Sequence, residues 1–366
     1  MPNTARRLNS RSKATEQPQP QAQEQLFRSV AAILRKKGEA DHETPEGDPH
    51  RLEKGLIDQY KGKRLEDLYD TRVEQTPVGE CLHLVDRFSP FSFNFPDPAI
   101  AGMSILSELR LVHGVGPVTL EELRRKGVES VRGLMGHKRF GEEAARIVGH
   151  WERRDLIVLH ERMRKRLGGE GHSLGLFLAS VIPQSGFLVL DLETLGLSGA
   201  PVFLYGIARC VGDSLEIHQY LARDGGEEPA ALMSALTHMQ EAMALITYNG
   251  QTADVPWLRQ RSALFGMGPL QEKLHIDLIY PTRFRYQTTG LPGEPMFDHK
   301  LSTVEKELLG VDRTDDVPGY LVPYFYKRYE TLHNVGPLVP IIDHNRADLV
   351  STARLLSFLG SVQNDS

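Results

Sequence analysis

Two carboxylates separated by one residue follow a short apolar run in the stretch from Gly186 to Gly199. The run has the length of a buried strand. Alternate residues of a strand project from one face, so Asp191 and Glu193 would lie side by side there. Neighbouring carboxylates repel each other, and a divalent cation, which takes hard oxygen ligands, relieves that repulsion. The alternative for this stretch alone is a strand that simply ends in a polar turn.

Two later stretches carry side chains of similar chemistry. In the first, a strand ends at Asn249, which is expected to shape the turn, and a helix starts near Asp254. An acid at a helix start is ordinarily a cap, which is the alternative role for Asp254. In the second, His344 and Asp348 are four residues apart and share a face of the last helix. Such a pair is also common on exposed helices, and Asp343 is a candidate cap of that helix.

Alternating strand and helix signals would position these residues from about residue 180 onward. Strands are expected over residues 187–192, 202–211, 215–221, 245–248 and 274–276, and helices over residues 229–243, 255–265, 301–309 and 338–359. Residues 212–214 read as a hairpin turn. Three antiparallel strands followed by β-α-β units predict an α/β fold, a mixed sheet flanked by helices.

The chain upstream of this domain divides into three parts. Residues 1–50 are expected to be a disordered tail and linker with one short helix at 26–37. Residues 51–100 are expected to be an extended or irregular segment with one helix before residue 79 and one strand at 79–85. Its last part, rich in Phe and Pro, disfavours a helix.

Residues 101–168 have two short helical patterns separated by the turn Gly114–Pro117. This arrangement resembles the helix-hairpin-helix module, in which the turn and the next helix hold a phosphate. The nucleic-acid-binding residues that this resemblance and the basic cluster after it indicate are Gly114, Val115, Gly116, Arg124, Arg125 and Lys126. The segment has 14 Lys/Arg and 9 Asp/Glu, which gives it a charge of +5. Since the whole chain has a net charge of −5, the rest of the chain has a charge of −10. The alternative is an ordinary helical hairpin.

Composition limits the class of protein. The 366-residue chain is 40% hydrophobic and 25% charged, which predicts a globular protein of two or three domains. No apolar run reaches the roughly 18 residues of a membrane helix, and no apolar signal core begins the chain, so a cytoplasmic protein without membrane contact is expected. The two cysteines, Cys81 and Cys210, make neither a disulfide framework nor a zinc site.

The order Asp-x-Glu, Asn-Gly-x4-Asp and His-x3-Asp resembles the DEDD, or DnaQ-like, superfamily of 3′–5′ exonucleases, which have the ribonuclease-H-like fold. Within it, the chain is similar to the YprB-like branch of bacterial and archaeal proteins. Further sequence segments and residues match this branch: LSTVEKELLG at 301–310, DVPG at 316–319, Pro323, Tyr326 and His344-Asn345. The resemblance implies a ribonuclease-H-like exonuclease domain over residues 180–362.

The resemblance also implies a mechanism. The four acids Asp191, Glu193, Asp254 and Asp348 would hold two divalent cations, Mg²⁺ or Mn²⁺. His344 would orient or deprotonate the attacking water. The backbone at Thr194 and Leu195 matches the part of the family that contacts the terminal nucleotide. The spacing departs from the family, since its histidine branch has His five residues before the last Asp and its tyrosine branch has Tyr four before.

The sequence therefore predicts a metal-dependent 3′–5′ exonuclease acting on DNA or RNA, with a single-stranded 3′ end as the expected substrate. Two alternatives stay open: a non-catalytic nucleic-acid-binding protein on the same scaffold, and a structure-specific endonuclease. The remaining acids and histidines are expected to be caps, turn residues or surface groups: His275, Asp277, Asp298, His299, Asp315 and Asp316. The aromatic residues at the following positions are expected to pack in the core or at its rim, with stacking on bases as the alternative: Tyr320, Tyr324, Phe325, Tyr326 and Tyr329.

Overall fold

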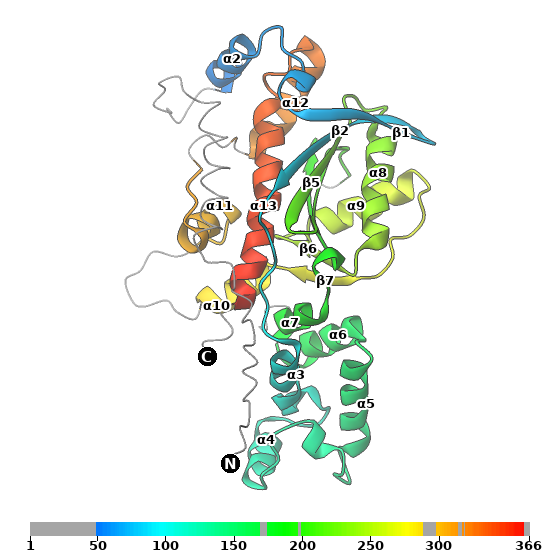
Figure 1. The fold of residues 1–366 in the computed structure, drawn as a ribbon, viewed down its shortest axis with the longest axis vertical. Helices are drawn as coiled ribbons and strands as arrows, with labels where there is room; N and C mark the ends of the chain where they lie inside the picture. Colours follow the sequence, from blue (N-terminus) through cyan, green and yellow to red (C-terminus); the bar gives the residue numbers. More distant parts are fainter. Residues whose placement is uncertain are drawn as a thin grey trace, which may run out of the picture.

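The computed structural model describes residues 49–168, 174–196, 199–287, 298–313, 317 and 319–361. A central sheet lies between helices, with a bundle of short helices at one end of the molecule (Figure 1). The tail expected over the first part of the chain, including the helix at 26–37, lies outside the described residues.

Seven strands form one mixed sheet in the order β1-β2-β5-β4-β3-β6-β7. They are β1 Asp70–Thr76, β2 Gly79–Phe88, β3 Phe187–Thr194, β4 Val202–Val211, β5 Ser214–Leu221, β6 Ala244–Thr247 and β7 Leu274–Asp277. The β3–β6 and β6–β7 pairs are parallel, and the others are antiparallel. The α/β sheet flanked by helices is therefore confirmed, since its strands from β3 onward coincide with the predicted ones.

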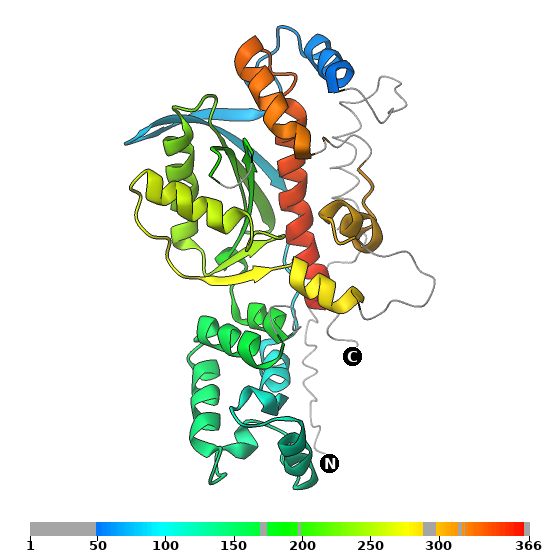
Figure 2. The same cartoon turned by 180° about the vertical axis from the view of Figure 1, so that it is seen from behind.

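Helices cover both faces of the sheet, because its strands bury side chains on both sides. Helices α8 (Glu228–Glu241) and α9 (Asp254–Leu264) lie on one side and α13 (Val339–Ser361) crosses the other (Figures 1 and 2). On β3, Leu188 and Leu190 pack with α8, whereas Phe187 and Val189 join the core that includes α13. Among the described helices, none is long and apolar enough to cross a membrane.

Three further helices lie between β7 and α13 in the chain: α10 (Ile279–Gln287), α11 (Leu301–Val304) and α12 (Val322–Leu332). A π-helical turn, Glu305–Leu309, continues α11 and ends at Gly310, which has a positive φ of 66°. The helix expected over 301–309 is thus present, as an α-helical turn followed by a π-helical turn.

The expectation of an irregular segment over residues 51–100 is wrong for much of its length. Helix α2 (Pro49–Gln59) opens this range, and the β1–β2 hairpin extends the main sheet through β2 and β5. Strand β2 confirms the strand expected at 79–85. Strand β1 has no apolar alternation to reveal it, because it lies at the sheet edge and exposes residues of both faces, including Val73 at 47%.

The helical bundle consists of α3 (Pro98–Ser107), α4 (Pro117–Arg125), α5 (Gly141–Glu152), α6 (Leu156–Arg166) and α7 (Leu174–Phe177). Helix α3 begins upstream of residue 101, where the predicted module starts, because Asp97 caps it through Ala99 N at 2.8 Å and Pro98 occupies its first turn.

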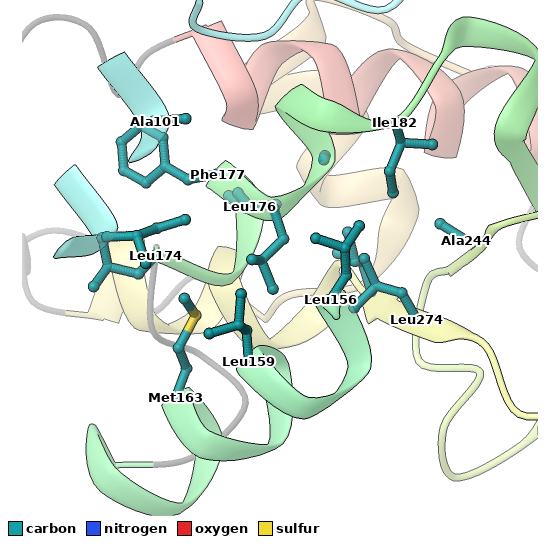
Figure 3. Packing of buried hydrophobic residues seen from close by; sticks show 14 of the residues in the cluster. Ala101, Leu156, Leu159, Met163, Leu174, Leu176, Phe177, Ile182, Ala244 and Leu274 are labelled. Carbon is teal, nitrogen blue, oxygen red and sulfur yellow. The ribbon is translucent and has the colours of Figure 1, made fainter. Parts of the chain in front are cut away.

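One continuous core joins this bundle to the sheet, so the predicted boundary between 101–168 and 180–362 is not a break in packing. Leu156 and Leu159 of α6 lie beside Leu274 of β7 and Leu176 of α7 (Figure 3). The same cluster of buried residues continues to Phe187 on β3 and to α13. The bundle and the sheet are therefore held to each other by apolar contacts.

A chain of neutral histidines lies between the sheet and α8. Arg72 Nε donates to His83 Nδ1 at 3.0 Å, so the proton of His83 is on Nε2, which donates to His218 Nδ1 at 3.0 Å. His238 of α8 bonds the Tyr220 hydroxyl through Nε2 at 2.6 Å. Burial is the main cause that lowers the pKa of His83 to about 3 and those of His218 and His238 to about 4.

We expect these histidines to weaken the fold in acid. A base whose pKa is lowered on folding takes up protons preferentially in the unfolded state, so its stabilisation is lost as pH falls below about 6.5. A His218→Gln variant removes one such group and keeps an acceptor for His83. The stability advantage of the wild type over this variant should shrink by about 1–2 kcal/mol between pH 7.5 and 5 in urea unfolding. A constant difference between the two proteins would contradict the buried neutral state.

Candidate metal-dependent nuclease site

Asp191 and Glu193 lie where β3 leaves the core. The strand is fully buried from Phe187 to Leu190, and the two acids follow on the face that α13 covers. The register of β3 with β4 shifts between Glu193 and Thr194, a bulge that ends the regular strand. Both acids therefore share one face, as the sequence predicts.

Thr194 and Leu195 continue the chain directly past these acids. Thr194 Oγ1 donates to Gly196 O at 2.9 Å, and Leu195 N donates to Pro201 O at 2.9 Å, so the turn is tied to itself. Both residues are half-buried, and Leu195 packs on the apolar cluster between the sheet and α12. Their contact with a nucleotide stays a prediction.

Asp254 joins the site from the opposite side of β3. The N-cap of α9 is Ala253, and Asp254 is the first residue inside the helix, so the cap alternative is wrong. The Asp254 Oδ1 atom instead accepts from Leu192 N on β3 at 2.9 Å. This bond crosses from α9 to the strand between the two acids and fixes Asp254 beside them.

Helix α13 supplies the third part of the site. His344 Nε2 lies 3.6 Å from Asp348 Oδ2, one helical turn away, so the predicted shared face is present. Asp343 is inside the helix and bonds the Tyr69 hydroxyl at 3.1 Å, so it is not the helix cap. Asp348 Oδ1 is also 2.6 Å from Arg313 Nη1, which in turn pairs with the buried Glu305.

These groups lie close enough to affect one another's pKa values. Burial raises the pKa of Asp191 well above its ordinary value, and the charges of Asp348, Asp254 and Glu193 raise it further, against the opposite effect of His344. Burial also raises the pKa of Asp254 to about 7, and hydrogen bonds from backbone N–H groups oppose this shift. The structure therefore brings together all five residues predicted to be catalytic.

Three of the four acids are each held through one oxygen by a donor from another segment. The pairs are Asp191 Oδ2 with Asn345 Nδ2 at 2.7 Å, Asp254 Oδ1 with Leu192 N at 2.9 Å, and Asp348 Oδ1 with Arg313 Nη1 at 2.6 Å. Fixed donors of this kind orient carboxylates toward a common centre.

The donor set suits Mg²⁺ or Mn²⁺ by chemistry and by charge, since both ions prefer carboxylate oxygens. The raised pKa values mean that the ionised carboxylates are unfavourable without a compensating cation. Among the described residues, no group of three or more His, Cys, Asp or Glu side chains is arranged so that it could hold a metal ion.

Asp277 has the turn role expected for it. Its two oxygens accept from Asn249 N at 2.6 Å and Gln251 N at 2.8 Å. Asn249 has a positive φ of 64°, which confirms that it shapes the turn before α9. Asp277 also raises the pKa of Asp254, so it adds negative charge to the site from β7.

Sequence reasoning missed two groups that contact the acids. Arg313 is 35 residues from Asp348 in sequence, and no periodic pattern links them. Asn345 belongs to the words shared with the family, but its residue type predicts no particular role beside a carboxylate. The side chain of Asn345 is fully buried, and this unusual position for an amide is visible only in the structure.

The basic residues predicted to accompany the turn at Gly114 do not lie beside it, and another arginine does. Gly114 has a φ of 85°, and α4 follows Gly116 without a side-chain cap. The basic residues 124–126 are exposed at the opposite end of α4, about 13 Å away for nine helical residues. Arg139 is closer, with Nη2 3.5 Å from the position that a Gly114 Cβ would take.

Two arginines of α6 hold the turn in place. Arg162 Nη1 donates to Leu111 O at 3.2 Å, and Arg166 donates to Arg110 O at 3.1 Å and to Val112 O at 3.3 Å. These bonds direct the carbonyl groups before the turn toward α6. A turn held in this way has a defined shape before any ligand binds.

Comparison with known proteins gives the class. Residues 188–359 match the model of the RNase_H superfamily. Together with the seven-stranded mixed sheet, this match identifies an RNase-H-like domain. Domains with this fold are commonly nucleases that act on nucleic acids and generally use divalent metal ions.

The chain is also similar to a curated protein. "Uncharacterized protein YprB" of Bacillus subtilis (strain 168) is 32% identical over 177 residues, which are 47% of this chain and 41% of that protein. The chain therefore matches less than half of the relative's length.

We expect Asp254→Asn to stabilise the protein without metal. An acid whose pKa is raised on folding favours the folded state while it is protonated. Its contribution to the free energy of unfolding is therefore complete at about pH 4 and is lost as pH rises through about 7. The neutral amide keeps an acceptor for Leu192 N and removes the repulsion, so the variant should be more stable by about 2–4 kcal/mol at pH 8 and equal near pH 4. Urea unfolding in EDTA measures this. Equal stability at pH 8 would contradict the strained carboxylate cluster.

Proposed function

We propose that the protein is a metal-dependent 3′–5′ exonuclease that hydrolyses phosphodiester bonds of DNA or RNA from a single-stranded 3′ end. The observation that carries this proposal is the convergence of four acids from β3, α9 and α13 at one strand end. A protein that only binds nucleic acid gains nothing from four acids directed at phosphates, because they repel the ligand. A cation-dependent hydrolase has a use for each of them.

In this proposal the acids Asp191, Glu193, Asp254 and Asp348 hold two divalent ions, Mg²⁺ or Mn²⁺. Such ions lower the pKa of a water molecule and stabilise the leaving 3′ oxygen. The chain itself supplies fixed carboxylates, each drawn from a rigid strand or helix. Preorganised charge of this kind contributes most when it is shielded from bulk water, as Glu193 and Asp254 are.

His344 has the position of the residue that orients or deprotonates the attacking water. It lies beside Asp348 at the rim of the acid cluster, with a side chain 20% exposed, so it reaches solvent. Imidazole titrates near neutral pH and suits proton transfer. Its spacing of four residues places it on the same helix face as Asp348, which supports the role despite the departure from the family's histidine branch. Thr194 and Leu195 would contact the terminal nucleotide.

The helical bundle is proposed to bind the nucleic-acid strand at a second place, distant from the acids. The turn of Gly114, Val115 and Gly116 would take one phosphate, as in a helix-hairpin-helix module. Arg139 stands beside this turn and supplies the positive charge there. Residues 124–126 would contact the strand further along, since they lie at the other end of α4.

Cleavage of labelled oligonucleotides tests the activity. The full chain with Mn²⁺ or Mg²⁺ should shorten 5′-labelled single-stranded DNA or RNA from the 3′ end, and EDTA should abolish this. Asp191→Ala should lower kcat by at least about 10³-fold, because it removes a ligand required by both reacting oxygens. Glu272→Gln, at an exposed carboxylate in the loop before β7, should leave the rate unchanged.

The product pattern decides against the alternatives. Internal cuts that do not begin at the 3′ end would replace the proposal with a structure-specific endonuclease. Tight binding without any cleavage would replace it with a non-catalytic binding protein.

The proposed role of the helical bundle predicts a difference between two arginines. In an Asp191→Ala background, Arg139→Gln should weaken binding of single-stranded DNA about 3- to 10-fold and reduce the slope of log Kd against log salt by about 0.7. Arg125→Gln should have a smaller effect, because Arg125 is paired with Glu121 at 3.0 Å and lies far from the turn. Fluorescence anisotropy at several salt concentrations measures both. Equal effects, or none, would contradict the assignment of a phosphate to the turn.

A further inference from the structure

Asn345 connects the catalytic helix to the sheet through a fully satisfied amide. Its Nδ2 atom donates to Asp191 O at 3.1 Å and to Asp191 Oδ2 at 2.7 Å. Its Oδ1 atom accepts from Gln219 Nε2 at 2.8 Å, and the same Gln219 nitrogen donates to Ile342 O at 2.9 Å. Each nitrogen faces two acceptors, so the orientation of both amides follows from their partners.

The partners of Asn345 occupy one row across three neighbouring strands. In the sheet register, Gln219 of β5 is opposite Gly206 of β4, and Gly206 is opposite Asp191 of β3. Directly paired residues point to the same face, so Gln219 and Asp191 flank the empty position above Gly206. Asn345 lies in that gap.

Only glycine leaves this gap open. A Cβ atom at Gly206 would lie 2.2 Å from Asn345 Oδ1 and 2.7 Å from Asn345 Nδ2. Gly206 does not need its freedom for a turn, because it lies in the middle of a buried strand, where glycine weakens the strand. The space for the Asn345 amide is the physical reason for it.

We propose that Asn345 is a positioning residue for Asp191. By engaging Oδ2 and the carbonyl of the same residue, it fixes the carboxylate so that Oδ1 is the oxygen presented to a divalent cation. Gly206 and Gln219 hold Asn345 in the correct place. This inference rests on the proposed metal-dependent nuclease.

The chemistry of an amide suits this task. A hydrogen bond to a carboxylate is strong, and the donor here is neutral, so it orients Asp191 without neutralising it. An arginine in the same place would compete with the cation for the charge of the carboxylate. The contrast is present in the site, because Arg313 makes such an ion pair with Asp348, whereas the donor to Asp191 Oδ2 is the neutral amide of Asn345.

Binding of Mn²⁺ to the full chain, measured by calorimetry at pH 8, tests the inference alongside oligonucleotide cleavage. Asn345→Ala should weaken Mn²⁺ binding by about 10- to 100-fold, as expected for loss of a group that orients a ligand. It should lower kcat while the KM for the oligonucleotide stays unchanged. Gly206→Ala, from a different strand, should reproduce both changes, because it displaces the same amide. Gln219→Leu should give a smaller loss of affinity in the same direction.

Asn334→Ala is the matched control. The Asn334 side chain also bonds the backbone, donating to Ile57 O at 3.2 Å, but it lies outside the acid cluster, in the loop between α12 and α13. This variant should lower the melting temperature without altering Mn²⁺ affinity or kcat. Melting of each variant in EDTA shows whether it is folded, and Gln219→Leu serves if Gly206→Ala does not fold.

The outcomes separate the two proposals. If the wild type binds Mn²⁺ and folded Asn345→Ala has the same Mn²⁺ affinity and the same kcat, the positioning role is overturned and the proposed nuclease is left intact. A wild type that neither binds Mn²⁺ nor cuts nucleic acid would overturn both.

Discussion

Repulsion among buried acids is the constraint on which the rest of this structure depends. Burial and the charge of neighbouring acids raise the pKa values of Asp191 and Asp254, so their ionised forms are unfavourable in the fold. Only surrounding structure that is stable in other ways can hold such groups in place. The chain meets this need with donors from three segments, a backbone N–H, an amide and a guanidinium, each bonded to one acid.

Helix α13 concentrates these functions, so its position must be fixed. Arg346, on the helix turn between His344 and Asp348, is half-buried; it pairs with Asp343 and, at 2.7 Å, with Asp86 of β2. Its guanidinium also lies over the ring of Tyr69, 5.3 Å from the centroid. The N-terminal hairpin therefore supports α13 from outside the region that matches the RNase_H superfamily.

The sequence predicts those parts of this architecture that leave a periodic trace. Strands β3 to β7 and helix α13 do so, because each buries a defined face. Strand β1 does not, since an edge strand with polar residues on both faces has no alternation. Asp254 is ambiguous for another reason: a cap and a ligand both stand at a helix start, and only the position of Ala253 decides between them. Arg313 and Gln219 act through contacts between distant segments, for which one sequence contains no signal.

The apolar core shared by the helical bundle and the sheet has a consequence for how long a nucleic acid must be. Leu156 of α6 and Leu274 of β7 pack in one cluster, which ties the helical bundle with the turn at Gly114 to the sheet with the acids of β3. Under the proposed function, a nucleic acid that contacts both places has to span the distance between them. A nucleic acid shortened below this span would lose one of its two contacts and would be held more weakly than its precursor.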